Sequence, residues 1–332
     1  MKNKVIAIPM GDPCGIGPEI VLKALMSPLL KDAVVVVAGD TTVFTYLCGA
    51  YHLKNPFDRV IENDLQLDQA LNDNVKKILY HLPLVDMSRF SFKVVSEMGG
   101  NAAYRSIEKC VDLALNSRVD ALATTPINKE SLKAAKIKAI GHTEILGELT
   151  GAPSPVTMFE TLGLHIFFMT RHLSLRDACD AVTFDRVYEF IHVVDEITRE
   201  QGFDQSVPLA VAALNPHGGE HGLFGNEEME HIVPAVSRCR EEGINVVGPI
   251  GADSVFHLAK IGKYKAVLSL YHDQGHIAAK TLDFERTISV TWKLPFLRTS
   301  VDHGTAFDIA GENRASEVSM VEAVNVALSY LG

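Results

Sequence analysis

Short runs of β-branched and other apolar residues alternate along this chain with longer segments in which apolar residues recur at helical spacing. The runs are almost continuously apolar, which is typical of strands buried on both faces of a parallel sheet. The alternation therefore predicts an α/β fold in which helices cover a mostly parallel sheet. The predicted strands are residues 5–9, 33–38, 119–123, 157–160, 164–169, 209–213, 245–247, 266–270 and 287–291. The predicted helices are residues 17–27, 101–116, 142–149, 185–201, 227–242 and 316–331.

The length of 332 residues allows roughly one to three domains. Residues 55–86 have the least regular pattern, which predicts an insertion or a domain edge. Residues 151–155 include two prolines and a glycine and indicate a domain boundary. No charge-free apolar stretch approaches the roughly 18 residues that a membrane-spanning helix needs, so no membrane partner is expected.

The charge balance limits the possible partners. The chain has 41 acidic and 31 basic residues, a formal net charge of −10, which argues against nucleic acids and anionic membranes. A small anionic substrate would need a local group of cations. Residues 263–298 contain six basic and three acidic residues, which predicts such a locally positive segment.

The five cysteines are an odd number, lie far apart and form no CxxC pair. This usage favours a reduced, cytoplasmic protein in which most cysteines are small core residues.

A glycine-rich string, GDPCGIGPE at residues 11–19, directly follows the first predicted strand and precedes a helix. Glycines allow close backbone approach to a ligand, and an anion could bind at the helix N-terminus. The spacing is not that of a GxGxxG dinucleotide fingerprint, so a simple tight strand-to-helix turn is an equal alternative.

Three histidines, His172, His217 and His272, each follow the end of a predicted strand. Open α/β sheets bind ligands at the carboxyl ends of their strands, so three imidazoles there predict an open divalent metal site. Each histidine could instead be a hydrogen-bonded structural residue. His272 and His276 have i, i+4 spacing and could both face one ligand if their segment is helical.

Cations and hydroxyls also gather in three motifs. Lys129 follows TTPIN, Lys280 follows YHDQGH, and Arg298 precedes Thr299 and Ser300. Lysine, arginine and hydroxyl groups together suit a phosphate monoester or a carboxylate. The alternative is that these cations are solvated surface charges.

The chain resembles the 4-hydroxythreonine-4-phosphate dehydrogenase family, which includes D-threonate and D-erythronate 4-phosphate dehydrogenase paralogues. The resemblance implies a two-domain fold similar to isocitrate and isopropylmalate dehydrogenases, with approximate lobes 1–130 plus 265–332 and 131–264. It also implies a homodimer with the active site at the subunit interface. The matching strings, in family order, are GDPCGIGPE, TTPINKE, GHTE, HLSLRD, ALNPHGGEHGLFGNEE, GPIGADSVF, YHDQGHIAAK and LPFLRTSVDHGTAFDIAG.

The resemblance implies roles for particular residues. One of the three metal-ligand histidines would come from the partner subunit, and the NAD contacts would lie around residues 302–310. The sequence departs from the family where an asparagine is usual and Ser289 stands, at Trp292 and Lys293, and more mildly at Cys14. The implied metal ligands are His172, His217 and His272, the substrate contacts are His142, Thr143, Lys280, Ser289 and Arg298, and the NAD contacts are Asp302, Gly304 and Thr305.

The reaction that the resemblance implies is an NAD-dependent oxidation of a 3-hydroxyl followed by loss of CO2, with one divalent metal ion (Zn, Mg, Co or Mn). The substrate would be 4-phosphooxy-L-threonine or D-threonate 4-phosphate. Candidates for the general base are Asp253, Asp273 and Lys129, and Asp273 could equally orient a metal ligand. The alternatives are a metal-dependent phosphatase or hydrolase and a non-enzymatic protein that binds a phosphorylated sugar.

Overall fold

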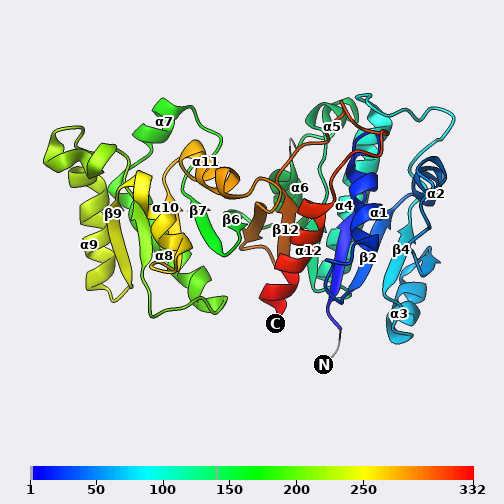
Figure 1. Cartoon of the computed structure of the whole chain (residues 1–332), viewed down its shortest axis with the longest axis horizontal. Coiled ribbons are helices and arrows are strands. Elements are labelled where there is room, and N and C mark those ends of the chain that lie inside the picture. The colour runs from blue at the N-terminus through cyan, green and yellow to red at the C-terminus, as the bar shows by residue number, and fades with distance from the viewer. Residues whose placement is uncertain (1–2, 140) are drawn as a thin grey trace. The chain divides into compact units, whose positions relative to one another are not determined.

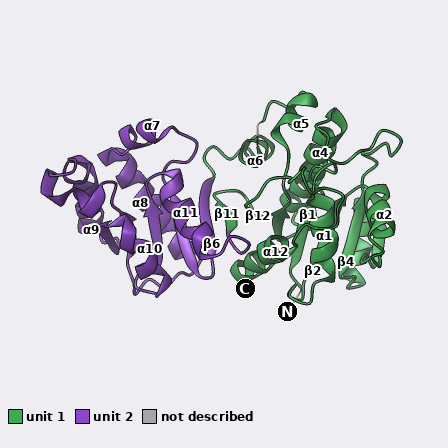
Figure 2. Cartoon of the chain, turned by 45° about the horizontal axis from the view of Figure 1, so that its top comes forward, with its two compact units in different colours: residues 1–155, 288–332 green, residues 156–287 purple. Residues whose placement is uncertain are grey.

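The computed structural model describes residues 3–139 and 141–332 and divides into two compact units (Figure 2). Unit 1 comprises Met1–Pro155 and Ile288–Gly332, and unit 2 comprises Val156–Thr287. The first junction lies at the proline-rich segment 151–155. Both junctions fall further along the chain than the limits of the predicted lobes, 1–130 plus 265–332 and 131–264.

Packing explains where the junctions fall. In unit 1, α5 (Lys129–Ala134) and α6 (His142–Thr150) pack against α4 (Glu97–Leu115). In unit 2, β10 (Ala266–Ser269) is hydrogen-bonded to strands on both of its sides. Through these contacts, residues 131–155 belong to unit 1 and residues 265–287 belong to unit 2.

The sheet of unit 1 is parallel except for its last pair, the antiparallel strands β12 and β11. Its order is β3 (Arg59–Ile61), β4 (Lys77–His81), β2 (Val34–Gly39), β1 (Val5–Pro9), β5 (Ala121–Thr124), β12 (Leu297–Val301) and β11 (Ile288–Trp292). The helices of unit 1 besides α4, α5 and α6 are α1 (Gly17–Met26), α2 (Thr41–Ala50), α3 (Asp64–Asn72) and α12 (Val318–Leu331) (Figure 1).

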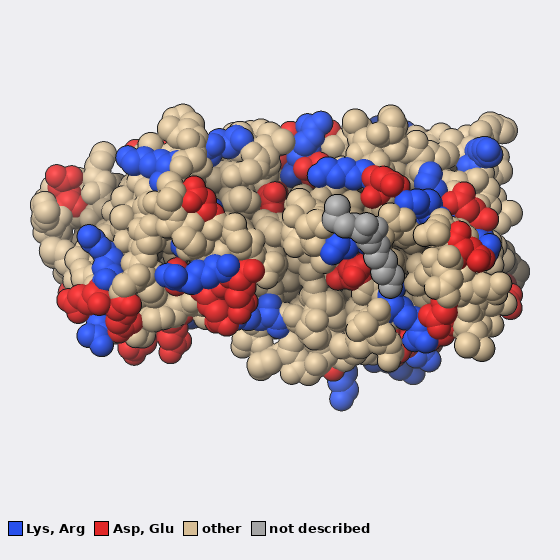
Figure 3. All heavy atoms as spheres, turned by 90° about the horizontal axis from the view of Figure 1, so that it is seen from below, with Lys and Arg blue, Asp and Glu red and all other residues tan. Residues whose placement is uncertain are grey.

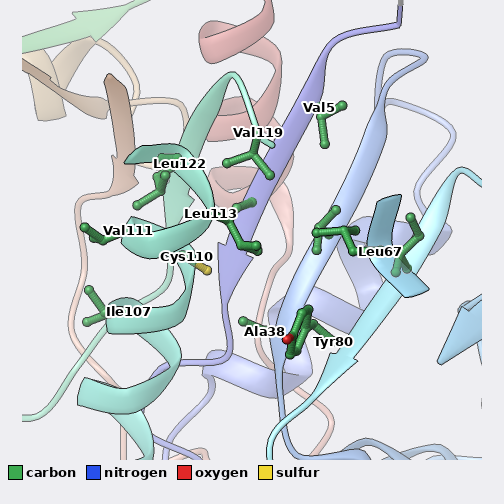
Figure 4. Close-up of a cluster of buried hydrophobic side chains, with 14 of the residues drawn as sticks. Val5, Ala38, Leu67, Tyr80, Ile107, Cys110, Val111, Leu113, Val119 and Leu122 are labelled. Carbon is green, nitrogen blue, oxygen red and sulfur yellow. The ribbon is translucent and has the colours of Figure 1, made fainter. Parts of the chain in front are cut away.

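The core of unit 1 forms where α4 covers the sheet (Figure 4). The helix begins at Ser96, whose hydroxyl accepts a hydrogen bond from the Gly99 amide. Its apolar side chains recur at helical spacing, and Ile107 and Cys110 are fully buried against the β-branched side chains of β1 and β2. The predicted near-continuous apolar strands are therefore covered here.

The sheet of unit 2 is parallel except for the hairpin of β6 and β7. Its order is β6 (Val156–Thr161), β7 (Leu164–Phe168), β10, β8 (Leu209–Ala212) and β9 (Val246–Ile250). Its helical segments are α7 (Leu175–Asp180), α8 (Phe184–Glu200), a 3₁₀ turn Pro216–Gly222, a π-helical turn Glu228–Ile232, α9 (Val233–Glu241), α10 (Ala252–Lys260) and α11 (His272–Leu282).

The predicted α/β class with mostly parallel strands is confirmed, and each predicted strand and helix overlaps an observed one. Of the two alternatives predicted for residues 55–86, the insertion was wrong, whereas their strands β3 and β4 do lie at one edge of the sheet. These residues form β3, α3 and β4, which are part of the unit 1 sheet. Their strands are short and partly exposed, so they lack the continuous apolar run by which the buried strands were recognised.

Two basic residues of the segment 263–298 form ion pairs in the folded protein. Lys265 is buried and lies 3.4 Å from the Asp195 carboxylate, and Arg286 lies 3.0 Å from Asp283. Asp195 lies outside the segment, whereas Asp283 is one of the three acidic residues already counted, so these two pairs reduce the local excess of positive charge without removing it, and the locally positive segment stays a prediction. On the face of the molecule that Figure 3 shows, acidic and basic side chains are interspersed. Among the described residues, no helix has the length and apolar character needed to cross a membrane.

Candidate functional site

The three predicted metal ligands follow three neighbouring parallel strands of unit 2. His172 follows β7, His272 follows β10 and His217 follows β8, and β10 pairs with both other strands. Since the carboxyl ends of parallel strands lie at one edge of a sheet, the fold brings these three segments to the same edge. Adjacent strands lie about 4.8 Å apart, so the outer two are roughly 10 Å apart.

Two buried side chains, which the sequence reasoning missed, tie these strand ends together. The Thr170 hydroxyl donates to the Leu270 carbonyl oxygen over 2.8 Å and links the end of β7 to that of β10. Gln274 donates from Nε2 to the Ala213 carbonyl oxygen (2.7 Å) and accepts from the Leu270 amide at Oε1 (2.8 Å). Gln274 therefore links the ends of β10 and β8. The available signal was a polar side chain inside the string YHDQGH, directly after a predicted strand.

His272 begins α11, and its ring is held on two sides. Its Nδ1 lies 2.6 Å from the Asp273 carboxylate and donates to it, which leaves Nε2 as the ring atom with a lone pair for a metal. His276 stacks on it, with ring centroids 3.6 Å and ring planes 10° apart. The in-plane lone pairs of two parallel rings do not converge. The two rings therefore do not coordinate one metal ion together, although their segment is helical as the hypothesis of a shared ligand requires.

His217 lies on an exposed loop with an unusual backbone. Five successive residues, 217–221, have positive φ, and the value at His217 is 53°. Such a conformation is strained for a residue other than glycine and occurs often at functional sites. The buried Glu228 fixes the start of the loop, since its Oε1 accepts from the amides of Leu214 and Asn215 over 2.8 and 2.7 Å.

Within residues 3–139 and 141–332, no three His, Cys, Asp or Glu side chains lie close enough together to hold a metal ion. The strand order still places the three histidine-bearing segments side by side, and imidazole nitrogens suit zinc, cobalt and similar divalent ions. The donor set of unit 2 therefore fits the predicted metal, and the assignment of these ligands remains a prediction.

Arg298 lies in unit 1 on a sheet face lined with hydroxyl groups. Only 5% of its surface is exposed, so the alternative of a solvated surface charge is contradicted. Its Nε and Nη2 donate to the Thr124 hydroxyl over 3.0 and 2.6 Å, and its Nη1 donates to the Thr291 hydroxyl over 3.0 Å. These hydroxyls fix the guanidinium, whose planar set of donors suits a carboxylate or a phosphate.

His142 belongs to the same electrostatic environment. It is the first residue of α6, and its pKa lies well below the usual value because burial, and then the Arg298 charge, disfavour the imidazolium. Its buried Nε2 has no hydrogen-bond partner within the described parts of the chain. A neutral imidazole with an unpaired buried nitrogen is ready to bind a polar ligand group. Thr143, the next residue of α6, is partly exposed.

Two departures from the family pattern, Ser289 and Trp292, lie on β11 and face opposite sides of the sheet. Ser289 and Thr291 oppose Ser300 and Arg298 across the β11–β12 pair, so they share the Arg298 face. Trp292 points to the opposite face and packs edge-on against Tyr330 of α12, with ring centroids 5.0 Å apart. Of the two departures on β11, Ser289 and Trp292, only Ser289 therefore lies on the Arg298 face.

The glycine-rich string and the predicted NAD segment contact each other in unit 1. The Ile16 amide donates to the Thr305 carbonyl oxygen over 3.0 Å. Gly15 permits this approach, because a Cβ there would lie 2.7 Å from the Thr305 side chain. Thr305 is buried, whereas Gly304 is exposed and Asp302 is partly exposed. The two segments thus form one surface before the N-terminus of α1.

The other predicted residues are exposed, except for Lys280, which is partly buried. Lys129 is the exposed first residue of α5 in unit 1, and Lys280 of α11 lies over the Phe284 ring at 5.1 Å in unit 2. Asp253 and Asp273 are exposed and line a cavity of about 700 Å³ in unit 2, which lies between α10 and α11. Among the predicted residues of unit 1, Arg298 shares its sheet face with Ser289 and its charge acts on His142. In unit 2, Asp273 is hydrogen-bonded to His272.

Comparison with known proteins decides the family. Residues 31–327 match the family model described as "Pyridoxal phosphate biosynthetic protein PdxA". The chain belongs to the PdxA family. It is 53% identical to the "Putative D-threonate 4-phosphate dehydrogenase" of Fusobacterium nucleatum, over 99% of this chain and 98% of that one. The protein of the same name from Halalkalibacterium halodurans is 50% identical over 99% of this chain and 97% of the relative.

A solved PdxA-family structure agrees with this assignment. The crystal structure of 4-hydroxythreonine-4-phosphate dehydrogenase from Klebsiella pneumoniae matches with a TM-score of 0.87 and 37% identity, covering 99% of this chain and 100% of that one. The family resemblance predicted from the sequence is confirmed, and so is the prediction of a dehydrogenase enzyme.

Proposed function

We propose that the protein catalyses the NAD-dependent and divalent-metal-dependent oxidative decarboxylation of a 4-phosphorylated four-carbon 3-hydroxy acid. The observation that carries the proposal is the delivery of His172, His272 and His217 by adjacent parallel strands. In a member of a dehydrogenase family, this arrangement favours metal-assisted oxidation. It agrees less well with the alternative of a two-metal phosphatase, which generally uses a carboxylate-rich ligand set.

The metal-holding residues are proposed to be His172, His217 and His272, with one of them from the partner subunit of a homodimer. A bound Zn, Mg, Co or Mn ion supplies Lewis acidity, which stabilises negative charge on the 3-oxygen of the substrate. Asp273 holds the His272 ring through Nδ1 and is therefore proposed as the residue that orients this ligand rather than as the base.

Substrate anions are proposed to bind to Arg298, His142, Thr143 and Lys280. Arg298 is fixed by hydroxyls before any ligand arrives, so binding requires little reorganisation of its side chain. The ring of the neutral His142 is hydrogen-bonded to the Thr125 backbone through its other nitrogen, so its buried Nε2 is offered as a hydrogen-bond acceptor to a protonated oxygen of the substrate. These groups hold the phosphate and carboxylate and so restrict the motion of the carbon that is oxidised.

The proton of the 3-hydroxyl is proposed to pass to Lys129 or Asp253. When bound, NAD supplies the hydride acceptor, and Asp302, Gly304 and Thr305 are proposed to hold it together with the glycine-rich turn that contacts Thr305. All five cysteines are free thiols, which is consistent with a cytoplasmic location.

D-threonate 4-phosphate is the favoured substrate over 4-phosphooxy-L-threonine. The relatives of 50–53% identity carry the name of the former activity. In addition, Ser289 replaces the usual asparagine on the Arg298 face, which is the one departure on β11 that faces the proposed anion site.

A side-by-side assay tests the proposal. Purified protein with NAD and Mg²⁺, Mn²⁺, Co²⁺ or Zn²⁺ should release one CO2 for each NADH formed, with a higher kcat/KM for D-threonate 4-phosphate. NADH without CO2 would leave a simple dehydrogenase. Release of inorganic phosphate without NADH would instead establish the phosphatase alternative.

A further inference from the structure

His276 belongs to the same motif as His272, but the reaction proposed above gives it no role. Its ring lies parallel to that of His272 at a centroid distance of 3.6 Å. Its Nδ1–H donates to the main-chain carbonyl oxygen of His272 over 2.8 Å. His276 therefore contacts both the side chain and the backbone of a proposed metal ligand.

Aromatic side chains of two strands fix His276 from its other sides. The ring centroids of Phe159 on β6 and Phe168 on β7 lie 4.3 and 4.6 Å from that of His276. The two phenylalanine rings also contact each other edge-on at 4.9 Å. Gly275 allows this close packing of α11 on the sheet, because a Cβ at that position would lie 2.5 Å from Phe168. The His276 ring thus transmits the rigidity of the sheet to the start of α11.

We propose that His276 is a positioning residue, which fixes the plane of the His272 ring so that this ring binds metal in one orientation. The inference rests on the proposed metal site. About 42% of the His272 side chain is exposed, so surrounding protein restrains it only in part. The single bond to Asp273 fixes one atom, Nδ1, whereas the stacked His276 ring restricts the whole plane. Residues that orient a metal ligand typically contribute about 10- to 100-fold to metal affinity.

The experiment uses the full chain and Co²⁺ alone as the probe, with the dissociation constant and the visible absorption band of bound Co²⁺ as readouts. His276→Leu keeps an apolar side chain against Phe159 and Phe168 but removes the flat ring. We expect about 10- to 100-fold weaker Co²⁺ binding and an altered absorption band. His276→Phe restores a flat ring and should recover most of the affinity.

A matched control separates positioning from general stability. His165 lies in the same unit, contacts the Phe203 ring at 4.7 Å and is hydrogen-bonded through Nδ1 to the Lys265 carbonyl oxygen (3.3 Å). It is at the amino end of β7, the opposite end from His172. His165→Leu should lower the thermal unfolding midpoint but leave Co²⁺ affinity unchanged.

The outcomes are distinguishable with one more variant, His272→Ala, which should abolish Co²⁺ binding. Loss of binding in His272→Ala with wild-type affinity in His276→Leu would overturn the positioning role alone. Equal loss of affinity in His276→Leu and His165→Leu would also overturn it, since the effect would then follow stability. Unchanged binding in His272→Ala would overturn the metal site of the proposed function, and the role of His276 would fall with it.

Discussion

The two units present their candidate ligand groups in opposite ways. In unit 1, Arg298 is buried in the sheet face and fixed by two hydroxyls, and His142 has a buried ring nitrogen. In unit 2, His172 and His217 are exposed on loops that follow the strands. Under the proposed function, the difference has a physical reason. Hydroxyls stabilise the arginine in the absence of ligand, whereas imidazoles gain from converging only when a cation is bound between them.

Replacing Arg298 tests the buried side of this comparison and should have the largest effect. Arg298→Met removes the fixed cation and leaves the hydroxyls of Thr124 and Thr291 buried without their donor. We expect kcat/KM to fall by about 100- to 1,000-fold, the scale seen when a preorganised donor is lost, and the unfolding midpoint to fall as well. Steady-state kinetics and thermal unfolding measure the two effects.

Arg286→Met is the control for this substitution, because Arg286 forms an exposed ion pair with Asp283. It should change neither quantity measurably. Full activity in Arg298→Met would show that the hydroxyl-lined face does not bind the substrate.

Replacing His217 tests the exposed side. His217→Gly should weaken metal binding and metal-dependent turnover by at least about 100-fold, since outer residues alone contribute up to that amount. Its unfolding midpoint should stay the same or rise, because a φ of 53° is favourable for glycine. Calorimetric titration with Zn²⁺ and thermal unfolding provide the measurements.

His221→Gly is a matched control in the same loop, where φ is 57°. It should raise or preserve stability in the same way and keep the metal affinity. If both variants bind Zn²⁺ as the wild type does, His217 is not a ligand.

The pH dependence of stability provides the smallest and most specific test. The pKa of His142 in the folded protein lies well below the usual value for histidine, chiefly because of burial and then because of the Arg298 charge, so unfolding allows this ring to take up a proton. Its contribution to stability is therefore present above about pH 6.5 and lost as the pH falls further. Urea unfolding between pH 5 and 7.5 should show a shallower pH dependence in His142→Gln than in the wild type. Parallel curves would mean that His142 titrates normally in the folded protein.

Much of the fold was predictable because buried parallel strands are almost wholly apolar. Residues 34–39 and 266–269 could be recognised from this property alone. The edge strand β3 could not, since it spans only Arg59–Ile61 and one of its residues is exposed. Helices α2 and α3 were missed as well, because they are short and carry few buried side chains.

The candidate site was predictable where it depends on chain position and not where it depends on side-chain contacts. Three histidines after three strands could be found by their spacing, but the strand order that makes them neighbours is a tertiary property. The contacts of Gln274 with Ala213, 61 residues away, leave no trace in spacing. The alternation of a strand implies that Ser289 and Trp292 face opposite sides, but which of the two sides carries Arg298 depends on the pairing of β11 with β12.

Unit 2 is formed by one continuous segment of the chain, whereas unit 1 is formed by two, and this affects the order in which they can fold during translation. Every strand of the unit 2 sheet lies between residues 156 and 287, so this sheet can be completed while the last part of the chain is still being synthesised. The contact between Arg298 and Thr124 spans 174 residues and joins segments made before and after unit 2. During translation, the strands that precede His172, His217 and His272 are therefore available first, and the face that carries Arg298 is completed only near release of the chain.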